Sequence, residues 1–481
     1  MWNYNALKQA AAENGVRVGE LLALAPANDP FYTGRPSELA ASQWFANLWA
    51  EFGYGHGVHL RRIHYQIVSQ DPPLKMPNGR TYENTLKCWN YLNNAAKWAR
   101  YLDAVPGESF VDRRNPEAII YRHFYKPDDW DYQDPTPGIN VQDTEDWEYY
   151  RVPEIPELPT LPTDLPEPPS LQVSGYYGIQ QPYLVEVWAE KTTMNDVLLP
   201  LCEQYSVNLV TGAGELSITA VISFLDRVAE SGLPARILYV SDFDPAGMGM
   251  PISVARKIEY YLRKGSYNLD IALEPIVLTS DQVQAYNLPR VPVKDSDRRK
   301  ANWQRDYGKG QTELDALEAL HPGELHNIVE QAILNYFDPT LPQRSRKTRR
   351  SLDWYLWDVR DDILNDNARE MDILKTQYAK IQEDYSATRA RFAEITAALQ
   401  EELDTYIARM ESLRNDGEDL YSKLYAELND VEVDLSEYPL PDPDLPAEAD
   451  DLLYDSIRSY ARQLTYYKAH RHNAKQIVQE A

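Results

Sequence analysis

Between residues 173 and 338, short apolar runs alternate with helical segments, and this alternation restricts the fold more than any other feature of the sequence. The runs are YLVEVWAE (183–190), VNLVTGAG (207–214) and ARILYVSDFD (235–244), and each precedes a segment whose apolar residues have helical spacing. This order is typical of an α/β fold, a doubly wound parallel sheet between helices. Ligands of such sheets bind beyond the carboxyl ends of the strands.

Carboxylates stand at two of these strand ends. Glu190 closes the first run, and Asp242 and Asp244 close the third. In extended backbone the two aspartates face one side and Phe243 faces the other. Three carboxylates at one edge are hard oxygen ligands that suit Mg²⁺, which can orient and neutralise a phosphodiester. A simple turn followed by a helix cap would also explain two aspartates here, so both interpretations stay open.

The length and the cysteines limit the class of protein. A chain of 481 residues has room for about two to four domains. Cys88 and Cys202 lie far apart in the sequence and match no metal-binding spacing, which argues against a disulfide framework or a zinc site. No run reaches the roughly 18 apolar residues of a membrane span, and no signal-peptide pattern opens the chain. We expect a cytoplasmic protein, nucleoid-associated if bacterial or archaeal, with no membrane partner.

The net charge of −26 is unusual for a protein that handles DNA, because phosphate binding is normally driven by Lys and Arg. The acidic residues are unevenly distributed, however. Residues 1–122 hold 13 basic and 11 acidic residues, whereas residues 123–170 hold 2 basic and 12 acidic residues. One domain can therefore present a positive surface while acidic segments repel nucleic acid elsewhere.

The first region, residues 1–125, is predicted to be helical and to end in a hairpin. Three segments have helical patterns, and the stretch after them alternates and turns like two short strands. This order is that of a winged helix, which places a late helix in a DNA groove. The predicted helices cover about 37–53, 59–70 and 82–102, and the predicted hairpin covers 103–124.

Three further regions complete the predicted organisation. Residues 126–172 are rich in proline and acid and are interpreted as an extended linker, and residues 173–338 form the α/β domain. Residues 339–481 begin with the basic run PQRSRKTRR (342–350), interpreted as a loop, and continue as an acidic helical or coiled-coil arm. Apolar residues of the arm follow a three-four spacing: Met371, Leu374, Tyr378, Ile381, Tyr385, Phe392, Ile395 and Leu399.

The motifs of the α/β region are similar to those of a known family. EVWAEKTTM, LVTGAGELS and YVSDFDPAG together resemble the Toprim domain, in which a strand-end Glu precedes a DxD. Among Toprim proteins they most resemble the A subunit of type IIB topoisomerase (topoisomerase VI) and the related meiotic double-strand-break transesterase. GQTELDALEAL (310–320) looks like that family's late acidic helix motif. The resemblance covers roughly residues 35–125 and 180–335.

The resemblance implies roles for individual residues. The family carries a tyrosine shortly after an arginine in its winged helix, and LRRIHYQ places Arg61 four residues before Tyr65. Tyr65 would then be the nucleophile that becomes linked to a DNA 5′ phosphate, and Arg61 would stabilise charge or lower the phenol pKa. Glu190, Asp242 and Asp244 would hold Mg²⁺, for which Mn²⁺ could substitute. Candidate DNA contacts are Arg62, Lys191, Arg344, Arg346 and Lys347.

Structural roles remain open for the residues around this tyrosine. Tyr65 can equally be a packing residue of an amphipathic helix. His64 is interpreted as a surface or helix-packing residue rather than a proton carrier, and Tyr82 is a weaker candidate nucleophile near the start of a helix.

Three functions are consistent with the sequence. The first is a Mg²⁺-dependent, homodimeric transesterase that makes staggered double-strand breaks in DNA, each active site pairing Tyr65 of one chain with the carboxylates of the other. A separate ATPase or other partner could dock on its helical arm. The second is a hydrolytic Toprim nuclease of a defence or mobile-element system, in which Tyr65 is structural. The third is a non-catalytic scaffold that binds DNA or a partner protein.

Overall fold

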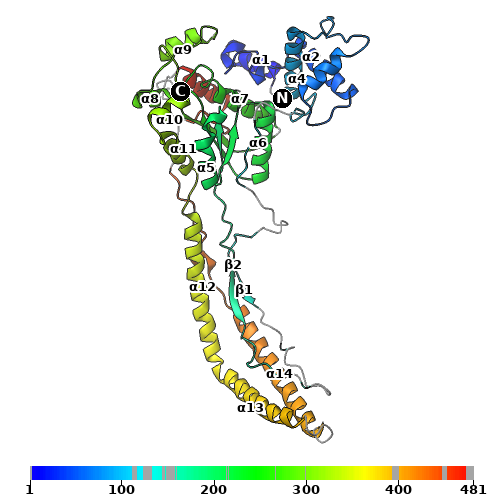
Figure 1. Ribbon diagram of the computed structural model, residues 1–481, viewed down its shortest axis with the longest axis vertical. Helices are drawn as coiled ribbons and strands as arrows, with labels where there is room; N and C mark the ends of the chain where they lie inside the picture. Colours follow the sequence, from blue (N-terminus) through cyan, green and yellow to red (C-terminus); the bar gives the residue numbers. More distant parts are fainter. Residues whose placement is uncertain are drawn as a thin grey trace. The chain divides into compact units, whose positions relative to one another are not determined.

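The computed structural model describes residues 3–110, 116–122, 133–142, 147, 158, 160–212, 214, 216–265, 267–297, 299–392, 400–446 and 452–472. The chain divides into two compact units (Figure 1). Unit 1 comprises Met1–Phe124, Gln181–Pro339 and Pro443–Ala481, and unit 2 comprises Tyr125–Gln180 and Thr340–Asp442. None of the described helices combines the length and the apolar character that a membrane crossing requires.

Unit 1 is built on a five-stranded sheet with the order β4-β3-β5-β6-β7. The first four of these strands are parallel to their neighbours, and β7 is antiparallel to β6. The strands are β3 (Leu184–Ala189), β4 (Asn208–Thr211), β5 (Ala235–Val240), β6 (Ile271–Val277) and β7 (Tyr454–Asp455). Every residue of β3, β4 and β5 is buried, as expected for parallel strands covered on both faces. The predicted α/β class with a mostly parallel sheet is confirmed.

Two separate apolar clusters pack against this sheet. One contains Phe224 and Leu225 of α6 (Ile218–Ser231) and Ile258 of α7 (Met250–Arg263). The other contains Leu198 of α5 (Asn195–Gln204) and Val329 of α11 (Glu324–Leu334). Further helices of the unit are η1 (Val18–Leu21), η2 (Pro30–Tyr32), η4 (Thr192–Met194), α8 (Ser280–Ala285), α9 (Lys300–Tyr307), α10 (Leu314–Leu320) and α15 (Tyr460–His472).

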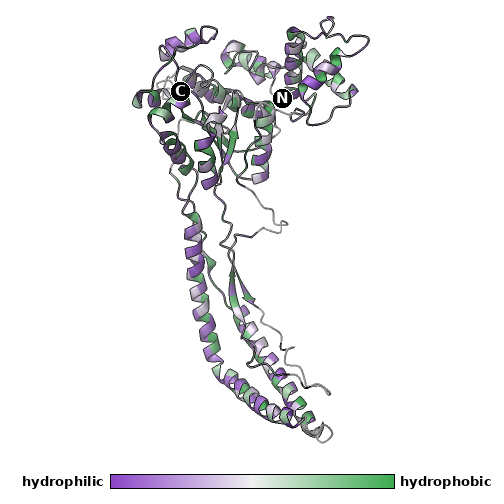
Figure 2. Ribbon diagram, viewed as in Figure 1, coloured by the Kyte–Doolittle hydropathy of each residue, from purple (hydrophilic) through white to green (hydrophobic). Residues whose placement is uncertain are grey.

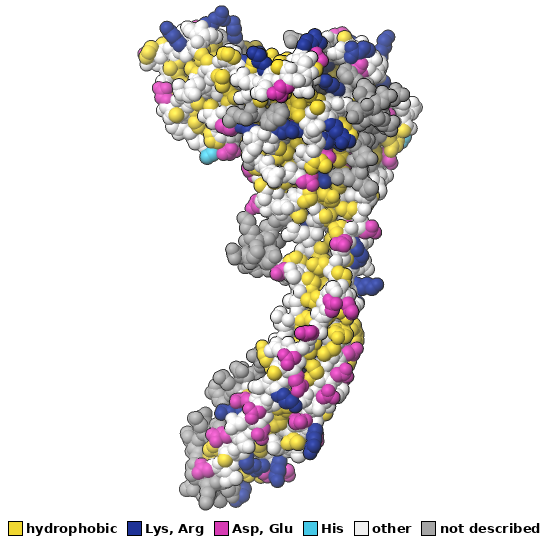
Figure 3. All heavy atoms as spheres, turned by 180° about the vertical axis from the view of Figure 1, so that it is seen from behind, with side chains coloured by type: hydrophobic (Ala, Val, Ile, Leu, Met, Phe, Trp, Pro, Cys, Tyr) yellow, Lys and Arg dark blue, Asp and Glu magenta, His cyan; other side chains and the backbone are white. Residues whose placement is uncertain are grey.

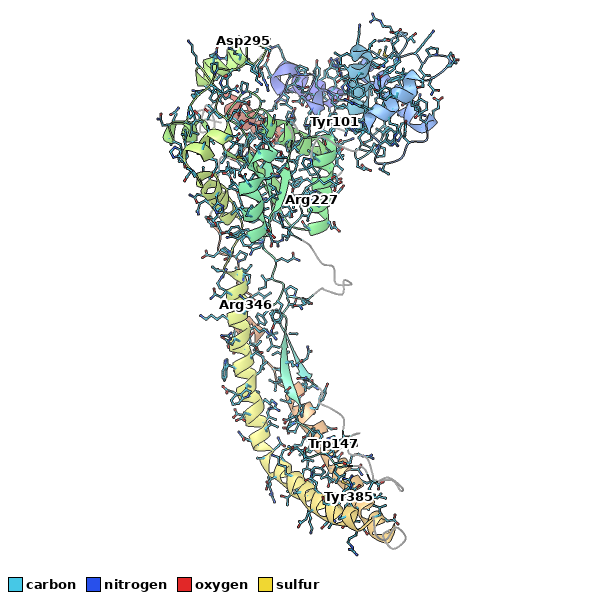
Figure 4. The ribbon with its side chains drawn as sticks, viewed as in Figure 1. Tyr101, Trp147, Arg227, Asp295, Arg346 and Tyr385 are labelled. Carbon is cyan, nitrogen blue, oxygen red and sulfur yellow. The ribbon has the colours of Figure 1, made fainter. Side chains whose placement is uncertain are left out.

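The N-terminal helices form a third cluster. After α1 (Tyr4–Glu13) come α2 (Pro36–Glu51), α3 (Leu60–Val68) and α4 (Leu86–Tyr101), close to the three predicted helices. Phe45, Ile63, Ile67 and Leu92 are buried between them. Helix α4 ends at Tyr101 (Figure 4). This end is tied to a helix that packs on the sheet, because the Tyr260 hydroxyl of α7 donates to the Tyr101 carbonyl at 2.7 Å.

The hairpin predicted over 103–124 is not formed by the described part of that segment. Phe110 bridges to Val58, and Ile119 bridges to Leu209 of β4 through two backbone hydrogen bonds of 2.8 and 3.0 Å. The Asn208 side chain also accepts from the backbone N–H groups of residues 121 and 122. Backbone N–H and C=O groups of the segment find their hydrogen-bond partners at the edge of the sheet, so they do not pair with each other as a hairpin would require. Residues 111–115, 123 and 124 lie outside the described residues.

A short antiparallel bridge instead lies between α3 and α4. Lys75 pairs with Thr81, and the Met76 N–H donates to the Arg80 carbonyl at 2.8 Å. Gly79, at the turn, has a positive φ of 80°. This is the conformation that a glycine adopts without steric cost, so the PNG sequence accounts for the turn.

Unit 2 contains strands within the segment predicted as a linker. β1 (Gly138–Gln142) pairs antiparallel with β2 (Ser170–Ser174). The long helices are α12 (Leu341–Asp366), α13 (Ala368–Phe392) and α14 (Gln400–Asn429), followed by η5 (Leu435–Glu437). The basic run 342–350 is helical rather than a loop. Its proline lies in the first turn of α12, where a missing N–H disturbs no helix bond, and the rest of the run contains no helix breaker.

Helices α13 and α14 pack antiparallel against each other. Asp384 of α13 forms an ion pair with Arg409 of α14, and Asn367, just before α13, donates to Glu427 near the end of α14. The start of α13 therefore lies beside the end of α14. Met371, Leu374, Tyr378, Ile381 and Tyr385 are buried. Ile395, Leu399 and the side chain of Phe392 lie outside the described residues. Both helices carry hydrophilic and hydrophobic residues (Figure 2), and acidic side chains are prominent over them (Figure 3).

Candidate functional site

Glu190 and Asp242 meet where the neighbouring strands β3 and β5 end. The Glu190 N–H donates to the Val240 carbonyl at 2.9 Å, which continues the pairing of the strands by one residue. The Asp242 N–H in turn donates to Glu190 Oε2 at 3.3 Å. Both side chains are buried, with 7% and 3% of their residues' surface exposed. Parallel pairing therefore brings together two carboxylates that lie 52 residues apart in the sequence.

Asp244 is held by the turn that follows it. Its Oδ1 accepts from the backbone N–H groups of Ala246 at 2.7 Å and Gly247 at 2.6 Å. Gly247 has to be a glycine, because an added Cβ would lie 2.1 Å from the Asp242 carbonyl oxygen and 3.1 Å from Glu190 Oε2. The PAG sequence after the DxD thus allows the turn to lie directly against the carboxylates.

Asp242 is also bound by two groups from other parts of the unit. The Leu314 N–H at the start of α10 donates to Asp242 Oδ1 at 2.9 Å. The Lys191 ammonium lies 2.5 Å from Asp242 Oδ2 and 3.6 Å from Glu313 Oε2. Thr312 pairs with Phe243 through two backbone bonds of 2.9 Å. The motif at 310–320 therefore contacts the DxD directly.

Phe243 points into the apolar core rather than into this polar cluster. Its ring lies 4.8 Å from that of Trp303 and 5.4 Å from that of Tyr307, measured between centroids. It is 1% exposed. The packing of this ring anchors the segment that carries the two aspartates.

Burial and mutual repulsion alter the acidity of the carboxylates. Burial, followed by the charges of Asp242 and Asp244, raises the pKa of Glu190 to about 7. Burial also raises the pKa of Asp244 from its ordinary value, against the effect of its two backbone hydrogen bonds. A cluster of this kind is typical of a functional site, since excess negative charge is held out of water there.

We expect the Glu190→Gln variant to show a weaker pH dependence of stability than the wild type. The native pKa of Glu190 lies above the ordinary value for glutamate, so the native state binds the proton more tightly than the unfolded chain does. The stability that protonation contributes is complete below about pH 4 and is lost as pH rises through about 7. Melting temperatures measured in a chelator from pH 5 to 8 should therefore fall more for the wild type.

The matched control for this measurement is Glu313→Gln, whose side chain is 53% exposed. It should keep the wild-type slope. If the melting temperature of Glu190→Gln differed from that of the wild type by the same amount at every pH, the raised pKa of Glu190 would be contradicted.

The donor set suits a hard divalent cation, but it is not a preformed cage. Glu190, Asp242 and Asp244 supply carboxylate oxygens, and the pKa of Glu190 is raised by burial first and then by neighbouring negative charge, which a cation would neutralise. Among the described residues, however, no three His, Cys, Asp or Glu side chains form a ready-made metal-binding group. Lys191 occupies one Asp242 oxygen, so an ion bound there would have to replace or share that contact.

Arg299, which the sequence interpretation missed, belongs to the electrostatic environment of the site. The Arg299 side chain donates two hydrogen bonds to Asp297. These bonds raise the pKa of Arg299 most, against the effect of burial, and the charges of Asp297, Asp244 and Glu190 raise it further. Arg299 lies just before α9, about 55 residues beyond the DxD, in a segment without a recognisable motif. Only the fold brings this charge close to the carboxylates.

Tyr65 lies on the exposed face of α3. It is 59% exposed, and Arg61 and Arg62 on the same short helix are exposed too. The opposite face is anchored by Ile63, His64 and Ile67. Within the described chain, no hydrogen bond or ion pair engages the Tyr65 hydroxyl or the two guanidinium groups, and none joins Tyr65 to the carboxylate cluster.

The structure gives packing roles to the other two residues considered near Tyr65. His64 is buried, and its ring nitrogens lie 2.7 Å from the Tyr82 hydroxyl and 3.1 Å from Asn84 Oδ1. Tyr82 is buried as well, and burial raises the pKa of its phenol far above the ordinary value. A phenol that resists ionisation is a poor nucleophile, which leaves Tyr65 as the better candidate.

The remaining predicted DNA contacts lie on α12 of unit 2. Arg346 projects from the helix (Figure 4), and Lys347 is also exposed. Arg344 instead bonds within its own unit, to the Asp442 carbonyl at 2.8 Å and to Thr340. The structure therefore leaves two of these three side chains exposed to solvent.

No protein-family model matches the chain, and a search of curated proteins found no match.

Proposed function

We propose that this protein is a DNA-cleaving transesterase that depends on a divalent cation and resembles the A subunit of topoisomerase VI. The observation that carries the proposal is the convergence of Glu190, Asp242 and Asp244 at the carboxyl edge of two adjacent parallel strands. Ligands of open α/β sheets bind at this edge. The buried, mutually repelling carboxylates favour a cation, and a phosphodiester is the substrate class that such a cation would hold.

The residues around the carboxylates have separate roles in this proposal. Glu190, Asp242 and Asp244 would hold the Mg²⁺ ion, which when bound neutralises and orients a phosphate. Lys191 offsets part of the local negative charge through its contacts with Asp242 and Glu313. Arg299 adds a second positive charge on the side of Asp244. These two cations would reduce the repulsion between the acidic site and the DNA backbone.

Tyr65 supplies the nucleophile in the proposed reaction. Its phenol oxygen, after losing its proton, bonds to the phosphorus, the bond from phosphorus to the 3′ oxygen breaks, and the departing 3′ oxygen takes up a proton. The product is a tyrosine linked to the 5′ phosphate and a free 3′ hydroxyl. Arg61, one helical turn before Tyr65, would stabilise the phenolate and the phosphate charge. Because a duplex has two strands, cleavage of both needs two copies of Tyr65, and we propose a homodimer.

Tyr65→Phe is expected to abolish the covalent protein–DNA product. The phenylalanine keeps the ring and lacks the oxygen that forms the bond. Supercoiled plasmid would be incubated with the protein and Mg²⁺ or Mn²⁺, quenched with detergent, and run on gels with and without proteinase. The matched control is Tyr177→Phe, since Tyr177 is also exposed, at 45%. Protein-linked breaks that persist at the wild-type level in Tyr65→Phe would contradict the proposal.

A hydrolytic nuclease is the second candidate function. It is favoured by one observation: within the described chain, no hydrogen bond or ion pair joins Tyr65 to the carboxylate cluster, so the cluster is assembled without the tyrosine. In the same assay this function gives breaks with free ends that survive Tyr65→Phe but not a substitution of Asp242. Absence of cleavage by every form would instead favour a scaffold, or an enzyme that requires a separate ATPase or other partner.

A further inference from the structure

Helix α12 of unit 2 has a buried face and an exposed aromatic face. Leu352 and Leu356 are almost fully buried against β2 and the segment after α14. Trp354 and Trp357, by contrast, are 64% and 56% exposed, with ring centroids 6.3 Å apart. Tryptophan is enriched in the energetically dominant part of protein interfaces. Two adjacent exposed tryptophans on a long helix therefore indicate a docking surface.

Charged residues extend these tryptophans into one stripe. Lys347, Arg350, Trp354, Trp357 and Asp361 follow one another at intervals of three, four, three and four residues, so they lie on one face of the helix. All five are exposed. In the described chain, Lys347 and Arg350 have no ion-pair partner, and the Asp361 side chain bonds only to Asn365, one turn further on.

The charge along α12 reverses at the tryptophans. Residues 342–350 contain five basic residues and no acidic one, whereas residues 351–366 contain five aspartates and one arginine. The helix has 26 residues, which corresponds to a length of about 39 Å. A second α12 running in the opposite direction would place each basic half beside an acidic half. The surface is therefore complementary to itself.

We propose that α12 is a self-association surface that binds α12 of a second copy of this chain in antiparallel orientation. In this pairing Trp354 of each copy packs against Trp357 of the other, and Arg350 of each copy lies opposite Asp361 of the other. The arrangement is isologous, as a twofold symmetric interface requires. The proposal uses no residue of the carboxylate site or of α3, but it rests on the proposed function in one respect, because it names a surface for the homodimer that cleavage of both strands requires.

The charge pattern selects a second copy over other partners. A nucleic acid would be attracted by Arg346, Lys347 and Arg350 but repelled by Asp358 and Asp361 within the next three turns. A purely basic or acidic protein surface would likewise match only half of the stripe. A second α12 matches both halves and also covers the tryptophans.

Removing the aromatic contact is the first test. Sedimentation velocity of the full chain should show a concentration-dependent dimer. The double variant Trp354→Ala and Trp357→Ala should raise the dissociation constant of this dimer at least about 30-fold, as expected for loss of an interface hot spot. The matched control is Ile373→Ala on α13, since Ile373 is also exposed, at 48%. Circular dichroism would establish that both variants keep their helices.

A charge exchange tests the antiparallel orientation. Arg350→Glu alone and Asp361→Arg alone should each weaken association, because each places like charges opposite one another in both symmetric pairs. A mixture of the two variants should associate again, because both cross-pairs then join opposite charges. Lys375→Glu, a reversal at an exposed position of α13, should have no effect.

These measurements separate the outcomes clearly. Dimer loss in the tryptophan variant together with recovery in the mixture would support the antiparallel α12 pair. A protein that stays monomeric, one whose association ignores all of these substitutions, or a mixture that fails to recover would overturn the proposal. Cleavage activity is measured separately, so a chain that still cleaves DNA and dimerises through another surface overturns the α12 pair and leaves the proposed function standing.

Discussion

Asp242→Asn is expected to lower cation-dependent DNA cleavage by about a thousandfold or more, equivalent to about 4 kcal/mol in the barrier. Asp242 is the central carboxylate of the site: its backbone N–H binds Glu190, and its two oxygens bind the Leu314 N–H and Lys191. Asparagine keeps the shape and the bond to Leu314 but removes the charge that would hold a cation. The plasmid assay with Mg²⁺ or Mn²⁺ measures the loss.

The comparison requires a carboxylate that lies in the same unit but outside the cluster. Asp295→Asn is suitable, because the Asp295 side chain is 99% exposed and pairs only with Lys300 among the described residues. That variant should cleave at the wild-type rate. If Asp242→Asn also cleaved at that rate with an unchanged melting temperature, the carboxylate cluster would not be the catalytic site.

Arg256→Met is expected to destabilise unit 1 by about 3–5 kcal/mol. Arg256 on α7 is 0% exposed, and its guanidinium donates to Asp29 at 3.2 Å and to Glu259 at 2.8 Å. Burial alone would lower the Arg256 pKa, but the charges of Asp29 and Glu259 raise it above the ordinary value. Methionine would fill a similar volume and leave the buried Asp29 carboxylate without its cation, while Glu259 would keep its ion pair with Arg263.

The same arginine joins three distant parts of the chain. It donates to the Tyr460 hydroxyl of α15 at 2.6 Å, and its guanidinium lies 3.9 Å from the centre of the Phe31 ring. Tyr460 in turn donates to the Leu21 carbonyl at 2.7 Å. Loss of the Arg256 guanidinium is therefore expected to weaken the packing of both the N-terminal segment and α15 against α7.

Urea unfolding followed by circular dichroism would measure this effect. Arg17→Met is the control, because Arg17 and Glu20 form an ion pair whose side chains are both exposed, at 89% and 47%. Such pairs contribute about 0–1 kcal/mol. A loss of stability below about 1 kcal/mol in Arg256→Met would show that the buried cluster does not stabilise the fold as its geometry suggests.

Local pattern was sufficient to predict the sheet and the strand-end carboxylates. The mostly apolar strands and the helices between them have few alternatives, because buried parallel strands need helices on both faces. The positions of Glu190, Asp242 and Asp244 at one edge follow from that topology alone. The three-four spacing of Met371, Leu374, Tyr378, Ile381 and Tyr385 was likewise sufficient to mark the buried face of α13.

Pairing between distant segments was not predictable in the same way. The alternation in 103–124 indicated a hairpin, but Ile119 found its hydrogen bonds at the edge of β4, where Leu209 offered unpaired backbone groups. The proline-rich segment 126–172 indicated a linker, yet residues 138–142 pair with 170–174. A strand pattern specifies that backbone groups must be paired, but not with which partner.

The sequence by itself determined the parallel α/β architecture, the carboxylate edge and the helical character of the arm, because these depend on periodicity and residue type within short windows. The tertiary structure decided what surrounds each charge. It placed Lys191 and the Leu314 N–H on Asp242, brought Arg299 near Asp244, and buried Arg256 between Asp29 and Glu259. The physical reason is that the energy of a charge depends on its neighbours and its distance from water, and both are set by segments that are remote in the sequence.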